Sequence, residues 1–191
     1  MANEIVFDIE TQNTFQEIGS RDCRLLKVSL VGVYQSATGE YSSFLEDELP
    51  KLWPILEHAD RIIGYNSKGF DIPVLMNYYP GDLKKIPSLD LLEIIEQRLG
   101  FRVKLDDVAH ATLGMGKSGH GLQAVEFWRN GEIEKLRDYC LQDVKVTKEV
   151  YEHGIKEGHV KFVDKLGRRT DIPVDFSLKE QRSALNLTMG F

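Results

Sequence analysis

Apolar residues alternate with polar ones, or gather in short runs, in several segments along the chain, and this pattern is typical of β-strands. Glycine, proline and small polar residues separate the segments, and Ala37-Thr38-Gly39 between two of them predicts a hairpin turn. We expect strands at residues 3–9, 25–35, 40–45, 61–65 and 86–90, and a last pair at 160–164 and 170–174.

Apolar residues at three- and four-residue spacing predict helices between and after the strands. These helices cover residues 47–58, 72–79, 91–99, 105–113, 122–130 and 133–153. Three strands come first, and then strands alternate with helices. This order indicates an α/β fold in which a mixed central sheet carries α-helices on both faces.

The chain has 191 residues, of which 42% are hydrophobic and 28% charged, and this composition excludes wholesale disorder. No apolar run approaches the roughly 20 residues of a membrane-spanning helix, so no association with a membrane is expected. The N-terminus lacks the pattern of a secretory signal, and Cys23 and Cys140 form no CxxC pair. We therefore expect a reduced, cytoplasmic compartment.

The charge of the chain is unevenly distributed. The net charge is −6, and residues 1–60 hold 4 Lys and Arg against 11 Asp and Glu. This balance argues against a protein that coats nucleic acid through bulk electrostatics. An anionic substrate would have to be met by local basic residues or by metal ions held on carboxylates.

The first predicted strand carries two acidic residues, Asp8 and Glu10. They are two residues apart, so both carboxylates point to one face, whereas Ile5, Phe7 and Ile9 on the other face pack inward. Two anions at the end of an apolar strand repel each other and lose hydration. Either the strand ends in a polar loop, or a cation holds the pair.

Asp71 follows the strand at residues 61–65 and a turn that contains glycine. In open α/β sheets, ligands bind beyond the carboxyl ends of the strands. Taken alone, however, Asp71 lies two residues before Pro73 and is better explained as the N-cap of the next helix.

Tyr139 and Asp143 are four residues apart in the longest predicted helix and therefore share a face. The stripe that we expect to be buried comprises Leu136, Tyr139, Cys140, Asp143, Thr147 and Val150. A charge within an apolar stripe needs a partner, which is either a neighbouring arginine such as Arg137 or a metal ion.

Considered together, the four carboxylates come from three separate segments, and the sequence offers no cysteine or histidine pattern with metal-ligand spacing. An all-oxygen set favours hard cations such as Mg²⁺ or Mn²⁺ over zinc. Sites of this kind serve phosphoryl chemistry, in which two metal ions stabilise the attacking and leaving oxygens.

Three motifs occur in order: Asp8-Ile9-Glu10-Thr11, then Gly64-Tyr65-Asn66 followed by Phe70-Asp71-Ile72-Pro73, then Tyr139-Cys140-Leu141-Gln142-Asp143. In these motifs the chain resembles the DEDD superfamily of 3′→5′ exonucleases, and most of all the proofreading domain of family-B DNA polymerases and their stand-alone relatives. The histidine subclass would have its histidine where this chain has Asp138, so the resemblance is to the tyrosine subclass. It implies a ribonuclease-H-like fold over about residues 3–155.

The resemblance also implies a role for each motif residue. Asp8 would bridge two Mg²⁺ or Mn²⁺ ions, and Glu10 and Asp143 would complete the shell of the first ion. Asp71 would hold the second ion through water. Tyr139, helped by Glu10, would orient the attacking water.

Further residues match, or lie near, positions that hold the substrate. Thr11, Asn66 and Phe70 match positions that bind the terminal nucleotide by hydrogen bonding or stacking. Phe15, in a polar loop, could wedge between the last two bases or tuck into the protein surface. Lys117 lies in a glycine-rich loop that lacks the spacing of a P-loop, and it could contact a backbone phosphate or remain a solvated lysine.

We therefore expect a metal-dependent 3′→5′ exonuclease that acts on the 3′ end of DNA, with single strands favoured, and releases nucleoside 5′-monophosphates. The alternatives are an exoribonuclease with the same site and a catalytically idle nucleic-acid-binding module. The exonuclease domain would span residues 1–155, and residues 156–191 would form a β-hairpin and tail packed on it. A polymerase or helicase activity would have to come from another chain.

Overall fold

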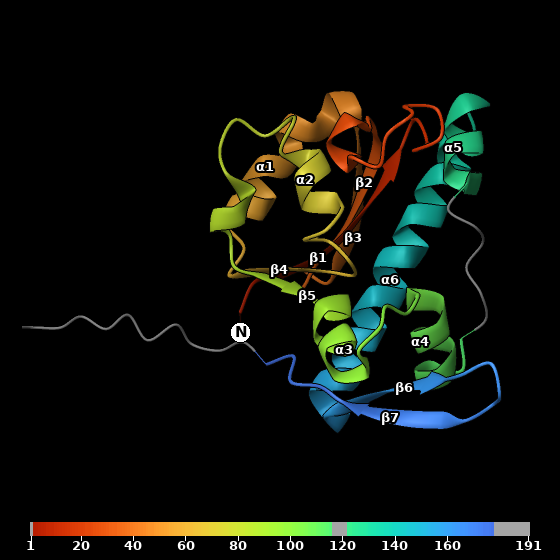
Figure 1. Ribbon diagram of the computed structural model, residues 1–191. Helices are drawn as coiled ribbons and strands as arrows, with labels where there is room; N and C mark the ends of the chain where they lie inside the picture. The colour runs from red at the N-terminus through yellow and green to blue at the C-terminus, as the bar shows by residue number, and fades with distance from the viewer. Residues whose placement is uncertain (1, 116–121, 178–191) are drawn as a thin grey trace, which may run out of the picture.

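The computed structural model describes residues 2–115 and 122–177 of the chain (Figure 1). The strands are β1 (Glu4–Thr11), β2 (Val28–Gln35), β3 (Glu40–Leu45), β4 (Arg61–Gly64), β5 (Ser88–Asp90), β6 (His159–Val163) and β7 (Arg169–Pro173). The helices are α1 (Leu49–Glu57), α2 (Asp71–Leu75), α3 (Leu91–Leu99), α4 (Leu105–Leu113), α5 (Leu122–Arg129) and α6 (Ile133–Glu157). Short 3₁₀ turns form at η1 (Cys23–Leu25), η2 (Glu46–Glu48) and η3 (Leu83–Lys85).

The central sheet has five strands in the order β3-β2-β1-β4-β5. Strand β1 pairs antiparallel with β2 and parallel with β4, so the sheet is mixed. Helices α1 and α2 lie on one face of the sheet, and α6 lies on the other face with α4 and α5 beside it (Figure 1). The predicted α/β fold with a mixed sheet between helices is therefore confirmed.

Strand β1 is covered from both sides. Ile5, Phe7 and Ile9 belong to the core on the α1 and α2 side, as predicted, and Val6 packs on the α6 side. Because β1, β4 and β5 run parallel, their carboxyl ends lie at one edge of the sheet. The residues that end or follow these strands are thereby brought to a common edge.

Several element boundaries differ from the prediction. The strand expected from residue 25 begins only at Val28, because Cys23–Leu25 forms a 3₁₀ turn whose N-cap is the Asp22 side chain. The helix expected at residues 72–79 is the shorter α2, and α6 continues to Glu157. None of the helices in the described part of the chain is both long and apolar enough to cross a membrane.

The hairpin expected near the C-terminus forms as β6 and β7, which pair antiparallel. It lies against α4 and the C-terminal end of α6, whereas α5 lies near the other end of α6 (Figure 1). The chain then returns to the core, where the buried Phe176 ring lies against Gly154 of α6.

Arg61, at the start of β4, fixes this returning segment. Its guanidinium donates to the carbonyl oxygens of Phe176 and Ser177 at 3.0 and 3.2 Å. The same side chain is 5% exposed and pairs with Glu4 of β1 at 2.5 Å. Residues 174–177 are thus joined to the central sheet by a buried charged group.

Candidate active site

Strand β1 presents Asp8 and Glu10 to helix α6. Asp8 is half-buried and Glu10 is buried. Oxygens of both carboxylates and the Cys140 Sγ lie within 4.8 Å of one another. The two acidic residues therefore share the α6 face of the sheet, as their spacing predicts.

Helix α6 reaches this part of the sheet because β2 has a glycine there. Gly32 pairs with Asp8 in the register of β1 and β2. A Cβ atom on Gly32 would lie 2.9 Å from the Cys140 Sγ and 3.0 Å from a methyl group of Val144. The missing side chain leaves room for the turn of α6 that carries Tyr139 and Asp143.

Asp71 approaches β1 from the opposite direction, at the first residue of α2. It is 3% exposed, and its Oδ1 accepts a hydrogen bond from the Ile9 backbone N–H at 3.1 Å. The helix N-cap is Phe70, and no side chain caps this helix end. The N-cap interpretation of Asp71 is therefore wrong, because its carboxylate is used between elements rather than within its own helix.

The four carboxylates act on one another electrostatically. Burial raises the pKa of Asp8 well above its usual range, and the charges of Asp71, Glu10 and Asp143 raise it further. Burial, followed by the charges of Asp143 and Asp71, likewise raises the pKa of Glu10. Burial raises the pKa of Asp71 to about 7, against the opposing effect of its backbone hydrogen bonds. Three distant segments thus bring four acidic groups into one water-poor place.

Tyr139 and Asp143 are both half-buried on the site-facing side of α6. The Tyr139 ring packs edge-on against Phe127 of α5, with 6.3 Å between ring centroids. Burial raises the pKa of Tyr139 far above its usual value, and the charges of Asp143, Glu10 and Asp8 raise it further. Its hydroxyl is therefore protonated at neutral pH and can donate a hydrogen bond.

The sequence left open whether Arg137 pairs with Asp143, and in the structure Arg137 binds other residues instead. Arg137 donates to the Ser43 hydroxyl at 2.6 Å. In the described part of the chain its ionic partners are Glu48 and Glu134, at 3.8 and 3.7 Å. The arginine is therefore used to join α6 to β3 and η2.

Cys140 was not expected at the site, although it belongs to the predicted buried stripe. Its thiol donates to the Asp8 carbonyl oxygen at 3.6 Å. Burial, followed by the neighbouring carboxylates, raises the pKa of this thiol well above its usual range, so it stays protonated. A neutral thiol is a poor metal ligand, which leaves the carboxylate oxygens as the donors of a cluster that fits a hard divalent cation.

A cavity of about 420 Å³ opens beside Glu10. Thr11, Phe15 and Phe70 line it, together with Leu122 and Val125 of α5. Phe15 is 41% exposed and packs edge-on against Phe70, with 6.1 Å between ring centroids. Phe15 thus forms one wall of an open cavity next to the carboxylates.

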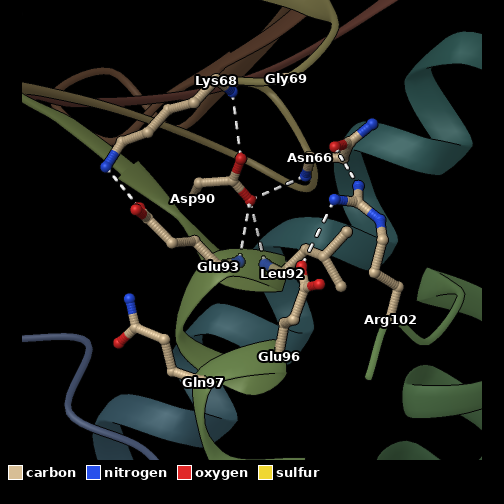
Figure 2. A pocket seen from close by; sticks show the side chains of 9 residues that line it. All are labelled: Asn66, Lys68, Gly69, Asp90, Leu92, Glu93, Glu96, Gln97 and Arg102. Atoms are coloured by element: carbon tan, nitrogen blue, oxygen red, sulfur yellow. Dashed lines mark hydrogen bonds and ion pairs between the residues drawn. The ribbon is translucent and has the colours of Figure 1, made fainter. Parts of the chain in front are cut away.

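Asn66, predicted to act with Thr11 and Phe70, is not among the residues of that cavity. It lines a second cavity of about 380 Å³, where its side-chain oxygen accepts a hydrogen bond from Arg102 (Figure 2). The intervening residues explain the separation, because Gly69 lines the second cavity and Phe70 the first. The remaining predicted contact, Lys117, lies outside the described residues.

Two residues of this second cavity were not singled out from the sequence. Asp90 ends β5 and is 4% exposed, and Arg102 follows α3. The sequence does show that Asp90 directly precedes a predicted helix, but an acidic residue at that position indicates a helix cap rather than a functional site. Nothing local to Arg102 predicts its contact with Asn66, 36 residues away.

Comparisons with known proteins agree with this architecture. No curated protein matches the sequence. Among solved structures, the family B DNA polymerase from the hyperthermophilic archaeon Pyrobaculum calidifontis is similar, with a TM-score of 0.62 and 23% sequence identity over 81% of this chain. The match spans 25% of the polymerase, and at this identity it shows a common fold.

A family model described as the RNase H superfamily matches residues 5–155. This range contains nearly all of β1, the whole of β2 to β5 and nearly all of α6, and with them every candidate carboxylate. The chain belongs to the RNase H superfamily.

Proposed function

We propose that the chain is a metal-dependent 3′→5′ exonuclease that releases nucleoside 5′-monophosphates, with single-stranded DNA as the favoured substrate. The convergence of Asp8, Glu10, Asp71 and Asp143 beside a cavity with aromatic walls carries the proposal. Membership in the RNase H superfamily supports a nuclease, and the three motifs support the exonuclease class.

Under this proposal, the four carboxylates hold two Mg²⁺ or Mn²⁺ ions. Their raised pKa values express the cost of collecting negative charge in a buried place, and divalent cations remove that cost. When bound, such ions act as Lewis acids toward a phosphodiester and stabilise the attacking and leaving oxygens. Asp8, Glu10, Asp71 and Asp143 would hold these ions in place, because their oxygens come from three elements of the folded core.

Tyr139 and Glu10 would position the attacking water. The Tyr139 hydroxyl remains protonated, so it donates a hydrogen bond to the water oxygen rather than removing its proton. Glu10 offers a carboxylate oxygen on the same side of the sheet to accept the proton of that hydrogen-bonded water. Phe127 supports this arrangement by packing against the Tyr139 ring.

The cavity beside Glu10 would take the terminal nucleotide. Phe15 and Phe70 present apolar ring surfaces against which a base can stack, and such stacking tolerates any base. A single strand reaches this cavity more easily than a duplex, because its terminal base is already unpaired. We also propose that a polymerase or helicase on another chain delivers the 3′ end.

The test is incubation with oligonucleotides labelled at the 3′ or the 5′ end, as DNA and as RNA, in Mg²⁺, Mn²⁺ or EDTA. The 3′ label should appear at once as a mononucleotide, whereas the 5′ label should remain on progressively shorter products. RNA cleaved faster than DNA would identify the exoribonuclease instead. Binding without cleavage would identify the idle module.

A matched pair of variants excludes a contaminating nuclease. Asp143→Asn should lose nearly all activity, whereas Asp138→Asn removes the same charge from an exposed position of the same helix and should keep it. Cleavage that persists in EDTA, or mononucleotides released first from the 5′ end, would refute the proposed function.

A further inference from the structure

Asp90 holds four backbone N–H groups in two different elements. Its Oδ1 accepts hydrogen bonds from the N–H groups of Asn66 at 2.8 Å and Leu92 at 3.0 Å, with Glu93 further away at 3.4 Å. Its Oδ2 accepts from Lys68 N–H at 3.0 Å. Figure 2 shows the carboxylate between the turn at residues 66–69 and the first turn of α3.

This arrangement goes beyond helix capping. The N-cap of α3 needs only the bonds from Leu92 and Glu93, which use one oxygen. By comparison, Asp82 caps η3 through a single bond from Lys84 N–H at 3.1 Å. The ammonium group of Lys68 pairs with Glu93 at 2.5 Å and not with Asp90. Among the described residues, the Asp90 carboxylate therefore accepts hydrogen bonds from backbone N–H groups alone.

The turn at residues 66–69, to which Asp90 is hydrogen-bonded, has an unusual conformation. Asn66 has a φ of 65°, and it is the one non-glycine residue with positive φ in residues 2–115 and 122–177. This left-handed conformation is unfavourable for residues with a side chain, although asparagine tolerates it better than most, so contacts from the surrounding structure help to hold it. Asp90 bonds to Asn66 N–H and to Lys68 N–H, on both sides of the turn's centre.

The turn leads directly to Asp71. The Ser67 carbonyl oxygen accepts a hydrogen bond from Ile72 N–H at 2.9 Å, which ties the turn to the start of α2. Asp71 precedes Ile72 and contacts β1 through Ile9 N–H. A shift of the turn would therefore move Asp71 relative to Asp8 and Glu10.

We infer that Asp90 is a positioning residue, which fixes the turn at residues 66–69 and through it the distance of Asp71 from the other carboxylates. This inference rests on the proposed function, in which Asp71 holds a metal ion. Asp90 itself would contact neither substrate nor metal ion.

Asp90→Asn separates positioning from capping. Asparagine keeps the carbonyl oxygen that caps α3 and caps helices as well as aspartate does. Its amide nitrogen, however, replaces the oxygen that accepts from Lys68 N–H and sets two donors against each other. Asp82→Asn is the control, because it makes the same chemical change at a cap whose carboxylate hydrogen-bonds to no other element in the described part of the chain.

Two readouts are needed for each variant: exonuclease rate against Mn²⁺ concentration, and Mn²⁺ binding to the protein without substrate. For Asp90→Asn we expect a rate about tenfold to hundredfold lower, weaker Mn²⁺ binding and a melting temperature close to that of Asp82→Asn. Adding Asp90→Asn to Asp71→Asn should cause no further loss, because both act through the same carboxylate.

An active wild-type protein whose Asp90→Asn variant retains full rate and Mn²⁺ affinity would overturn the inference. Fully additive losses in the double variant would also overturn it. A wild-type protein without exonuclease activity would refute the proposed function, and the Mn²⁺ binding arm would still decide the role of Asp90. If Asp90→Asn does not fold, Asp90→Ser offers a capping hydroxyl with one oxygen instead of two and carries the same expectations.

Discussion

The Cys140 thiol occupies the space where a side chain on Gly32 would stand. Gly32 faces Asp8 across the pair of strands, and the thiol donates to the Asp8 carbonyl oxygen. This contact sets how closely the middle of α6 approaches the sheet. The distance from Asp143 to Asp8 therefore depends on two residues that have no charge.

Gly32→Ala should damage the site more than the fold. The added Cβ would lie 2.9 Å from the Cys140 Sγ, so the Cys140 side chain or α6 itself must shift. We expect a loss of about 1–3 kcal/mol in the free energy of unfolding, and a drop in exonuclease rate of more than about tenfold. Adding Cys140→Ala should restore part of both quantities. A rate that stays low while stability recovers would show that the site is misplaced for another reason.

The stability of the metal-free protein should fall as pH rises through the carboxylate range. Asp71 has a folded pKa of about 7 against an ordinary value of 3.8, so the folded chain keeps a proton that the unfolded chain has released. The contribution of this proton to the free energy of unfolding is fully present below about pH 4 and is lost as the pH rises through about 7. Asp8 and Glu10 are raised in the same direction.

Thermal melts between pH 5 and pH 8 measure this effect. We expect the melting temperature in EDTA to decrease over this range, and saturating Mg²⁺ to remove most of the decrease. His153 has a pKa lowered by burial and contributes the opposite slope. Comparing the wild type with Asp8→Asn cancels that contribution, and the variant should show the shallower decrease. A metal-free wild type that gains stability relative to Asp8→Asn toward pH 8 would contradict the prediction.

Tyr139→Phe and Asp143→Asn should differ in their effect on metal binding. Tyr139→Phe keeps the ring against Phe127 and loses only a hydroxyl that positions water. We expect its turnover number to fall by about 10²–10³ with the Mg²⁺ midpoint unchanged. Asp143→Asn should lower the rate further and raise the midpoint, because it removes charge from the carboxylate cluster. A Mg²⁺ titration of the rate distinguishes them, and the reverse pattern would exchange the two roles.

Phe15→Ala should weaken substrate binding without a large effect on stability. The Phe15 ring is 41% exposed, so the variant loses little buried apolar surface and should remain nearly as stable as the wild type. It does lose one of the two ring surfaces against which a base can stack in the cavity. We expect the KM for a single-stranded oligonucleotide to rise about tenfold to hundredfold. Leu166→Ala, at a residue that is 78% exposed on the distant hairpin, is the control. Equal KM values for both variants would place the terminal base elsewhere.

The sequence predicted the elements whose ends are marked by local signals. The helices at residues 91–99 and 105–113 have the expected bounds, because Gly100 and Gly114 end them in the left-handed conformation. The clustering of the four carboxylates was predicted from the spacing of three motifs and from the family resemblance that they carry, whereas periodicity alone placed only Asp8 with Glu10 and Tyr139 with Asp143. These features depend on spacing along the chain, and spacing is visible in a sequence.

The features that depend on contacts between distant segments were not predictable. Asp71 has the local sequence pattern of a helix cap, but its carboxylate accepts a hydrogen bond from the backbone N–H of Ile9 on β1. The contact of Cys140 with Gly32 requires the register of β2 against β1, which no local pattern gives. The turn at Asn66 likewise depends on Asp90, 24 residues later.

The packing of Phe176 against Gly154 determines how much of the chain unfolds as one cooperative unit. A polypeptide that ends at residue 155 would lack Phe176, Ile172 and Val160, all of which belong to the same core as Val144 of α6. It would also leave the buried Arg61 guanidinium without two of its carbonyl acceptors. Each hydrogen bond lost from a buried charged group costs roughly 1.5–3 kcal/mol, which is a large share of the 5–15 kcal/mol that holds a typical domain. The smallest cooperatively folding unit is therefore longer than the superfamily homology, and proteolysis of the native protein should spare residues 156–177 until the central sheet itself unfolds.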